Sequence, residues 1–383
     1  MDFRLTEAQQ EMQSAARAYA QDKLPELADH IERTAEPPTH ELIKEYAEMG
    51  FLGINIPEAL GGLGQTSLDA LIVLEEFGKI SSAIAFPVFE SCTGPVKAIE
   101  HFGTEARKQR VVPAVCAGEM VVAIAMSEPN AGSALTDLTT RAEVGRDSVR
   151  INGMQRWCSG GGHADGYLVY CRMSDDPGAK GIGAVFIEKD TKGVSFGEQE
   201  HLMGFRGVPS SDIFLDDVEI PIDNVVVGAG GFKKLMQAFD LERCGNATMS
   251  MAQAAGALDE VIERLRAGAQ TVRQTHHRLP GCAAAARRDA DAGRRRAPAH
   301  PPCDLQCRGG HAQHPGKLDR QVLRQRDFTH SHRQRRPAHG RLWLLQGVPH
   351  RTPHARRLGL GHRRRCHRYP EDQHRERDGG EAV

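Results

Sequence analysis

The amino-acid composition of this 383-residue chain changes near residue 264, and the change limits how much of the chain can build a packed core. Residues 264–383 contain 26 Arg and 13 His, a single Lys, and no Ile, Met or Asn. A segment with so little apolar area does not offset the conformational entropy that folding removes. We therefore expect residues 264–383 to be poorly structured and to lack a packed helical bundle.

A shift of the translation frame accounts for this composition. Translation of GC-rich coding DNA in a wrong frame favours Arg, Ala, Gly, Pro and His. When the codons permitted by residues 268–281 are moved forward by one base, they can spell Glu-Arg-Lys-Gln-Phe-Gly-Lys-Pro-Ile-Thr-Asp-Phe-Gln. The codons around residues 341–361, and those from His362 onward, can likewise spell balanced sequence that contains Ile and Tyr. The sequence therefore predicts an out-of-frame tail from about residue 264 to the end of the chain.

The net charge of −1 conceals two oppositely charged parts. Residues 1–263 hold 22 basic and 40 acidic residues, whereas residues 264–383 hold 27 basic and 10 acidic residues. A basic tail is typical of proteins that bind nucleic acid or an anionic membrane surface. Because the frame shift explains the tail, we expect no nucleic-acid partner. For the same reason we expect no metal at the zinc-like cluster of two Cys and two His between residues 303 and 314.

Nothing in the sequence predicts entry into a membrane. The segment Met1–Arg4 and the residues after it lack the basic and apolar regions of a signal peptide. No run of apolar residues reaches the roughly 18 that a spanning helix needs. The five Cys of residues 1–263 show no spacing pattern, which suits a reducing compartment. We expect a cytoplasmic protein without membrane insertion.

Residues 1–120 show the periodicity of α-helices. Thr6 and Gln9 have the spacing of a capping box, which opens a helix. Apolar residues recur at helical spacing over residues 41–49 and 68–77. We therefore expect residues 1–120 to form an amino-terminal α-helical domain.

Residues 121–228 show the periodicity of β-strands instead. Val121–Met126 is a short apolar run, and residues 148–152, 166–171 and 182–187 are interpreted as alternating between apolar and polar side chains. These features predict a middle β domain over residues 121–228, built as a small barrel or sandwich.

Helical periodicity returns after this β region. One helix is predicted from about Phe232 to Glu242, and another through Leu258. Residues 229–263 would then be the start of a carboxy-terminal helical domain. The fold class predicted for the chain is α+β multidomain: a helical domain, a small β-barrel or sandwich, and a helical bundle that is intact only to about residue 263.

Two motifs in the β region contain groups suited to a flat ligand with phosphates. Ser127–Ser133 directly follows the strand predicted at Val121–Met126, and its Pro and Gly predict a tight loop with free backbone N–H groups and two hydroxyls. Asn152–Gly161 contains Trp157, whose ring could stack on a heterocycle. Each motif alone also fits a simpler role, the first as a plain turn and the second as a packing residue.

The two motifs in this order resemble the acyl-CoA dehydrogenase family. The middle domain of that family carries Thr-Glu-Pro-x-Ala-Gly-Ser and then Asn-Gly-x-Lys-x-Trp-Ile-Thr-Asn. The turn-rich loop Pro57–Gly64 resembles the family's Pro-Glu-x-x-Gly-Gly-x-Gly segment. The resemblance covers about residues 3–263 and extends to three further segments, residues 101–105, 203–206 and 239–243.

The resemblance implies FAD as the cofactor and assigns roles to the matching positions. Ser127 stands where Thr is usual and keeps a hydroxyl for the flavin, and Trp157 would stack on the isoalloxazine ring. Asp240 and Arg243 match residues that contact the pantetheine arm of the CoA substrate. The positions that the resemblance implies for cofactor binding are Met126, Ser127, Gly132, Ser133, Trp157 and Ser159.

Glu242 is the predicted catalytic base. The reaction of the family removes an α-proton and a β-hydride from an acyl thioester, so it requires a carboxylate base. In most members this base lies near the carboxy terminus, at the position of Arg364, which would become Gly in the restored frame. A minority places the base on the preceding helix, one residue before an Arg, as Glu242 precedes Arg243. A Glu-Arg pair is also common on helix surfaces, where it has no catalytic role.

The resemblance implies α,β-dehydrogenation of an acyl-CoA in fatty acid metabolism, with electrons passed to an electron-transfer flavoprotein. By the same analogy we expect a homotetramer or a dimer, and a base on the helix suggests a branched or cyclic acyl chain. Two alternatives stay open. One is a flavin-dependent monooxygenase of related fold, and the other is an inactive frame-shifted product that retains only part of the fold.

Overall fold

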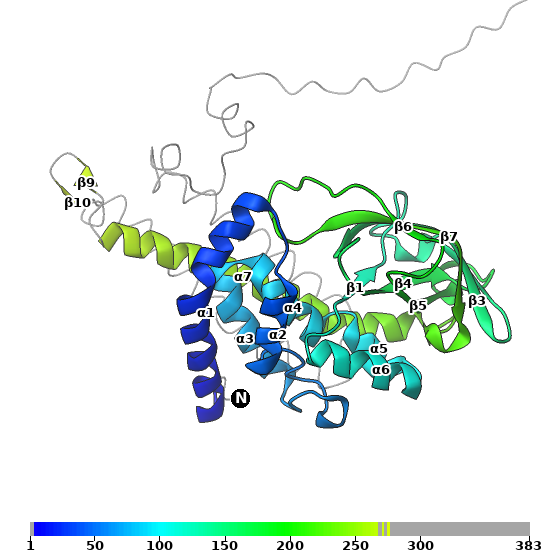
Figure 1. Ribbon diagram of the computed structural model, residues 1–383, viewed down its shortest axis with the longest axis horizontal. Helices are drawn as coiled ribbons and strands as arrows, with labels where there is room; N and C mark the ends of the chain where they lie inside the picture. Colours follow the sequence, from blue (N-terminus) through cyan, green and yellow to red (C-terminus); the bar gives the residue numbers. More distant parts are fainter. Residues whose placement is uncertain (1–3, 267–269, 272–273, 276–383) are drawn as a thin grey trace, which may run out of the picture. The chain divides into compact units, whose positions relative to one another are not determined.

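The computed structural model of the protein describes residues 4–266, 270–271 and 274–275 (Figure 1). Most of the predicted out-of-frame tail, including the zinc-like cluster, therefore lies outside the described residues. Within the described part, six helices are followed by a mainly antiparallel sheet, one long helix and a short two-stranded ladder. This order agrees with the predicted succession of helical and β regions.

The amino-terminal helices begin at side chains that satisfy free backbone N–H groups. The Thr6 side chain accepts a hydrogen bond from the N–H of Gln9, and the Gln9 side chain accepts one from the N–H of Thr6, so the predicted capping box is confirmed. A second box, formed by Thr66 and Asp69, opens the helix predicted over residues 68–77. The helices are α1 (Glu7–Thr34), α2 (His40–Glu48), α3 (Ser67–Ile80), α4 (Ser82–Thr93), α5 (Val96–Phe102) and α6 (Glu105–Cys116).

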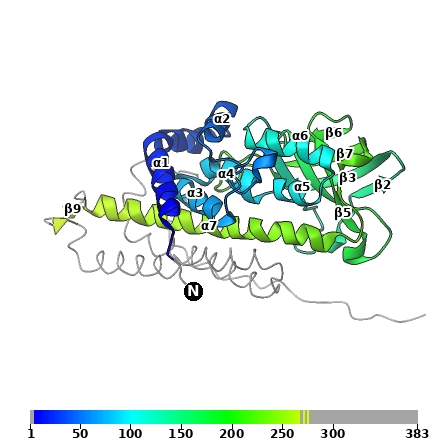
Figure 2. The same ribbon diagram turned by 90° about the horizontal axis from the view of Figure 1, so that it is seen from below.

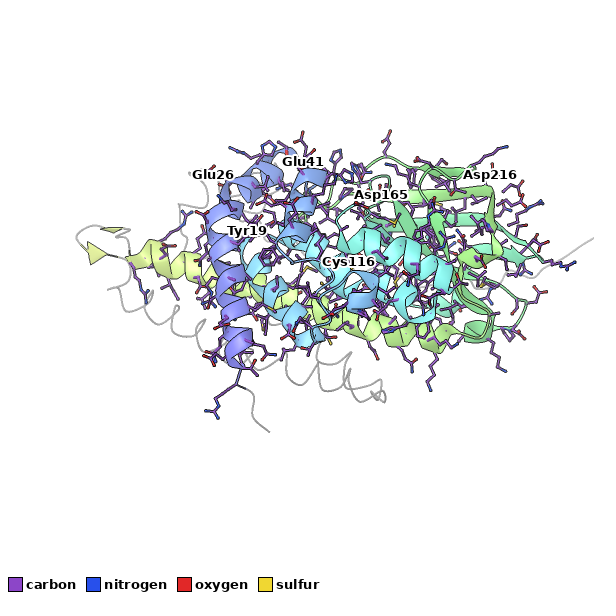
Figure 3. The ribbon with its side chains drawn as sticks, turned by 60° about the horizontal axis from the view of Figure 1, so that its bottom comes forward. Tyr19, Glu26, Glu41, Cys116, Asp165 and Asp216 are labelled. Carbon is purple, nitrogen blue, oxygen red and sulfur yellow. The ribbon has the colours of Figure 1, made fainter. Side chains whose placement is uncertain are left out.

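Aromatic side chains hold α1 against α2 and α3. Tyr19 of α1, labelled in Figure 3, has its ring centre 5.8 Å from that of Phe77 and 5.2 Å from that of Phe51. Tyr46 of α2 meets the same Phe77 edge to face at 5.1 Å. Each such pair contributes about 0.5–1.5 kcal/mol beyond the area that it buries. This cluster fixes α3 and, through the short connection after it, the start of α4.

The β region forms one eight-stranded sheet among the described residues. The strands follow the order β6-β7-β3-β2-β4-β5-β8, and β1 pairs in parallel with β4. The N–H of Val121 donates to the carboxylate of Asp165 at 2.8 Å, which ties the start of β1 to the start of β4 (Asp165 is labelled in Figure 3). The strands are β1 (Val122–Ala125), β2 (Arg141–Val144), β3 (Ser148–Ser159), β4 (Gly166–Arg172), β5 (Ile182–Glu188), β6 (Val194–Phe196), β7 (Ser210–Pro221) and β8 (Val225–Val227).

Strand β4 is buried on both faces. Leu168 and Tyr170 belong to an apolar cluster that also contains Leu235 from the long helix. Tyr167 and Val169 alternate with them and belong to a second cluster within the sheet. Burial on both faces explains why residues 166–171 form a nearly continuous apolar run. The sheet is therefore covered by helices at β4.

The two helices predicted after the sheet are one continuous helix, α7 (Phe232–Arg266). The prediction of two separate helices, with a break after Glu242, is wrong. Gly245 follows Glu242 within α7 and packs against α4, and this contact stabilises the helix there. A Cβ at Gly245 would lie 2.7 Å from Oγ1 of Thr93 and 2.8 Å from the ring of Phe89, so α7 approaches α4 closely at this point. Tertiary contact thus overrides the low helix propensity of Gly. Figure 2 shows α7 running alongside the α3–α4 helices and on to the sheet.

No described helix combines the length and the apolarity that are needed to cross a bilayer. The described chain ends with β9 (Gln270–Thr271) and β10 (Gln274–Thr275), which pair in antiparallel fashion.

Candidate active site

The predicted flavin loop, Ser127–Ser133, follows β1 directly and closes as a tight turn. Glu128 and Ala131 exchange two backbone hydrogen bonds of 2.8 and 3.2 Å. Gly132 and Ser133 after this turn are exposed. A Cβ added to Gly132 would meet nothing within 4 Å, so the space beside it is open. The loop can therefore admit a ligand close to its backbone.

The carboxylate of Glu128 anchors this loop to the segment before β2. Its Oε2 accepts hydrogen bonds from the N–H of Thr139 at 2.8 Å and from Thr139 Oγ1 at 2.7 Å, and its Oε1 accepts one from the N–H of Thr140 at 2.6 Å. Burial raises the pKa of Glu128, but these hydrogen bonds lower it more, so its pKa lies below the usual value. Sequence reasoning missed this role. The only signal was an acidic residue inside an otherwise neutral loop.

A β-bulge in β3 brings the second motif to the loop. Between Gln155 and Cys158, β3 carries one residue more than its partner β7. Trp157 lies at this bulge with a φ of 58°, a region that costs a residue with a side chain about 1–3 kcal/mol. The N–H of Arg156 donates to the backbone oxygen of Ser127 at 2.7 Å. The structure thus joins the two motifs that the sequence separates.

Arg156 supports the Trp157 ring from one side. Its guanidinium carbon lies 4.3 Å from the centre of the indole ring. The same guanidinium pairs with Asp212 at 2.6 Å and with Glu200 at 3.4 Å, which hold it in place. Trp157 remains 53% exposed. A fixed but exposed indole beside an open loop is a preformed stacking surface, and these residues fit a flat heterocyclic cofactor such as FAD.

The other predicted cofactor residues lie on the same two segments. Ser159 ends β3 and pairs with Ser210 of β7. Met126 packs at the edge of the apolar cluster under the loop. The loop after β1 and the end of β3 therefore carry all six of these residues.

Glu242 is a buried carboxylate on the first third of α7. It is 7% exposed, so the alternative of a helix-surface carboxylate is wrong. Its Oε1 accepts a hydrogen bond from Nη2 of Arg243 at 2.9 Å. Burial raises the pKa of Glu242 to about 7, while Arg243 and Asn246 act in the opposite direction. A carboxyl group with this pKa can accept and release a proton near neutral pH.

The two predicted substrate residues flank Glu242. Arg243 reaches back over Phe239, with its guanidinium carbon 3.8 Å from the ring centre. Asp240 is partly buried in the same helical turn. Burial raises the pKa of Tyr170 on β4. The charge of Glu242 raises this pKa further, and the charge of Arg243 lowers it. The base candidate therefore lies where α7 meets the sheet.

The sequence of this chain is similar to those of known proteins. The sequence profile of the acyl-CoA dehydrogenase N-terminal domain matches residues 6–119, and that of the acyl-CoA dehydrogenase middle domain matches residues 123–218. The chain is 35% identical over 272 residues to 3-sulfinopropanoyl-CoA desulfinase of Variovorax paradoxus, which covers 69% of this chain and 68% of that one. It is 34% identical over 275 residues to acryloyl-CoA reductase (NADH) of Anaerotignum propionicum, with 70% and 69% covered.

Solved structures share the fold at lower identity. Glutaryl-coenzyme A dehydrogenase in complex with glutaryl-CoA matches with a TM-score of 0.85 and 22% identity, over 91% of this chain and 89% of that one. Butyryl-CoA dehydrogenase of Megasphaera elsdenii matches with a TM-score of 0.81 and 24% identity, over 93% of each chain. The FAD complex of PigA matches with a TM-score of 0.82 and 20% identity, over 91% of each chain.

The fold is therefore the one that acyl-CoA dehydrogenases adopt. With two matching domain profiles and a relative at 35% identity over 68% of its length, the chain belongs to the acyl-CoA dehydrogenase family of oxidoreductases. The predicted family is thus confirmed. The solved complex of PigA, which shares this fold, contains FAD.

Proposed function

We propose that this chain is an FAD-dependent dehydrogenase that converts an acyl-CoA thioester to its 2-enoyl-CoA, with Glu242 as the catalytic base. The observation that carries the proposal is the buried carboxyl of Glu242, which is 7% exposed and has a pKa raised to about 7 at the junction of α7 and the sheet. The chemistry requires a base with this property beside an acidic α-carbon.

Some residues of the chain would bind the cofactor and the substrate, and another would transfer the proton. Trp157, supported by Arg156, offers the stacking surface, and the loop before it offers backbone N–H groups and hydroxyls for the cofactor. When bound, FAD would accept the β-hydride. Glu242 would take the α-proton at its carboxylate, and Asp240 and Arg243 would hold the pantetheine arm of the substrate. Low exposure around Glu242 excludes water and keeps its carboxylate reactive.

Rapid mixing of the protein with acyl-CoAs under anaerobic conditions tests this proposal. Flavin absorbance should bleach with the parent protein, whereas Glu242→Gln should bind FAD and acyl-CoA but lose about 10²–10⁴-fold in rate, because Gln cannot accept the proton. If Glu242→Gln bleaches at the parent rate, Glu242 is not the base. Bleaching without oxygen also separates the dehydrogenase from a flavin-dependent monooxygenase.

A frame-restored chain belongs in the same experiment. In the family, a segment near the carboxy terminus places a backbone N–H at the thioester oxygen, and loss of one such donor costs on the order of 10²-fold. The chain as written carries Arg363–Arg365 in that segment, so we do not expect it to place this N–H as the family does. We therefore expect the frame-restored chain to be faster than the chain as written. Bleaching in the frame-restored chain alone would favour the inactive frame-shifted product, equal rates would argue against an effect of the frame shift, and no bleaching in either chain would contradict the proposed function.

The electron acceptor, the oligomeric state and the cellular setting are inferred by analogy with the family. We propose an electron-transfer flavoprotein as the electron acceptor, a homotetramer or dimer as the assembly, and fatty acid metabolism in the cytoplasm as the setting. All five cysteines in the described residues are buried thiols, which suits a reducing compartment. Electron transfer to a purified electron-transfer flavoprotein, followed by dye reduction, tests the acceptor.

A further inference from the structure

Arg172, the last residue of β4, binds the backbone of the segment that follows the candidate flavin loop. Its Nη2 donates a hydrogen bond to the backbone oxygen of Thr136 at 2.7 Å, and its Nε donates one to the backbone oxygen of Leu138 at 3.1 Å. Both acceptors lie between the loop Ser127–Ser133 and β2, outside the strands. One guanidinium therefore holds two backbone oxygens of a segment that is not part of the sheet.

The loop between β4 and β5 holds the same guanidinium from another direction. Nη1 of Arg172 donates to the backbone oxygen of Asp176 at 2.9 Å. A Cβ at Gly181, the residue before β5, would lie 2.5 Å from this Nη1, so the missing side chain leaves room for the guanidinium. A planar guanidinium carries its donors in a fixed geometry, which the single ammonium of Lys does not provide. Arg172 thus joins the two loops at a defined separation.

Glu128 holds the next residues of the same segment through the opposite backbone groups. Its carboxylate accepts hydrogen bonds from the N–H groups of Thr139 and Thr140, whereas Arg172 donates to backbone oxygens. Hydrogen bonds to a charged side chain are stronger than those between neutral groups. Two side chains of opposite charge therefore fix the backbone of residues 136–140.

The residues that would bind the cofactor lie between two fixed points. Gly132 and Ser133 are exposed, so packing in the core does not set their position. The turn of Glu128 and Ala131 precedes them, and the segment that Arg172 binds follows them. A loop that is ordered before binding loses less conformational entropy when the ligand binds. Loss of the second fixed point should therefore weaken binding, although no group that would contact the cofactor is removed.

We propose that Arg172 is a positioning residue for the cofactor, because it holds the backbone after the loop Ser127–Ser133 in the conformation that binds FAD. This inference rests on the proposed function. Arg172 acts through the loop and not by contact with the cofactor, since its Nε, Nη1 and Nη2 atoms all donate to backbone oxygens.

Titration of the full-length apoprotein with FAD, followed by flavin fluorescence, tests the proposal. Arg172→Met should bind FAD about tenfold or more weakly than the parent, because the loop must then become ordered on binding. Arg172→Lys keeps the charge but not the planar geometry, so its affinity should fall between the two. If Arg172→Met binds FAD as tightly as the parent, the inference is wrong. If Arg172→Met does not fold, equal affinity of Arg172→Lys and the parent has the same meaning.

A matched control separates positioning from a general loss of stability. Arg107 is 8% exposed and donates to Asn224 and Glu188, neither of which belongs to the loop. Arg107→Met should lower the Tm but leave the FAD affinity unchanged. Hydrogen exchange of the apoproteins should be faster over residues 132–138 in Arg172→Met and unchanged there in Arg107→Met. Equal loss of FAD affinity in both variants overturns the inference, whereas a parent protein that binds no FAD contradicts the proposed function itself.

Discussion

At the scale of single residues, the ionisation of Glu242 sets the expected pH dependence. A base acts only in its ionised form, and burial raises the pKa of Glu242 to about 7. We predict that the rate of flavin reduction by acyl-CoA increases as the pH rises through about 7 and levels off above it. Stopped-flow absorbance across this range measures the rate. A profile that is flat between about pH 5.5 and 8.5 would contradict the role of Glu242.

The same pKa shift predicts an opposite trend for stability. The folded pKa of Glu242 lies above the unfolded value of about 4.3, so the folded state binds more protons between the two values. Its contribution to the free energy of unfolding is therefore present at low pH and lost as the pH rises toward about 7. Glu242→Gln should be more stable than the parent at pH 8, by on the order of 1–3 kcal/mol, and nearly equal at about pH 4. Urea titrations at both pH values measure the difference, and equal stabilities at pH 8 would argue against a buried, ionised Glu242.

Arg156 gives a prediction for cofactor binding. Arg156→Met removes both the cation over the Trp157 ring and the ion pair with Asp212, so the stacking surface loses its support. Loss of a cation–π contact of about 0.5–2 kcal/mol corresponds to FAD binding that is roughly 2- to 30-fold weaker. Titration of the apoprotein with FAD, followed by flavin fluorescence, measures the change. Arg150→Met, an exposed substitution on the same strand, should leave the affinity unchanged.

Sequence motifs identified part of the candidate site because those residues lie in local loops with a recognisable pattern. The Ser127–Ser133 loop and Trp157 are of this kind. Glu128 was not predicted, because its role depends on groups distant in the chain, namely the backbone of Thr139 and Thr140. The sequence does not show whether a carboxylate has hydrogen-bond partners in the folded protein.

At the scale of secondary-structure elements, the contact between α4 and α7 is expected to tolerate no added volume. Gly245→Ala places a Cβ 2.7 Å from Thr93 Oγ1 and 2.8 Å from the Phe89 ring. Ala improves helix propensity by about 1 kcal/mol, but overpacking costs about 1–3 kcal/mol, so the Tm should fall. Thermal unfolding by circular dichroism measures it. Asp259→Ala, an exposed change on the same helix, should leave the Tm equal or slightly higher.

The elements themselves were predictable where local signals set them. Thr6 and Gln9 satisfy backbone groups within one turn. Burial on two faces gives β4 and β5 nearly continuous apolar runs instead of the predicted alternation. The single helix α7 was not predictable, because its continuity depends on the packing of Gly245 against α4. The pairing order of the strands was not predictable from the sequence either, since β3 pairs with β7 across 50 residues of intervening chain.

At the scale of the whole molecule, the change of composition at residue 264 leads to a test that needs no protein. We predict that the coding DNA around codons 260–270 carries an insertion or deletion relative to the frame that spells the balanced sequence. The physical reason is that a chain without Ile or Met over 120 residues lacks the side chains that build a core. Sequencing of this region from independent clones measures it. An intact frame that encodes the tail as written in every clone would refute the prediction.

Each of the three apolar clusters in the described part contains at least one of the five buried thiols. These thiols can therefore report local unfolding of each cluster. Cys92 and Cys244 lie in the cluster around α3, Cys116 in the cluster beneath β4, and Cys158 and Cys171 in the cluster within the sheet. A buried thiol reacts with an alkylating reagent only when its surroundings open, so its labelling rate reports the free energy of that opening. Mass spectrometry of the labelled peptides would give one opening free energy for each cluster. Addition of FAD should slow the labelling of Cys158, next to the stacking surface, more than that of Cys92.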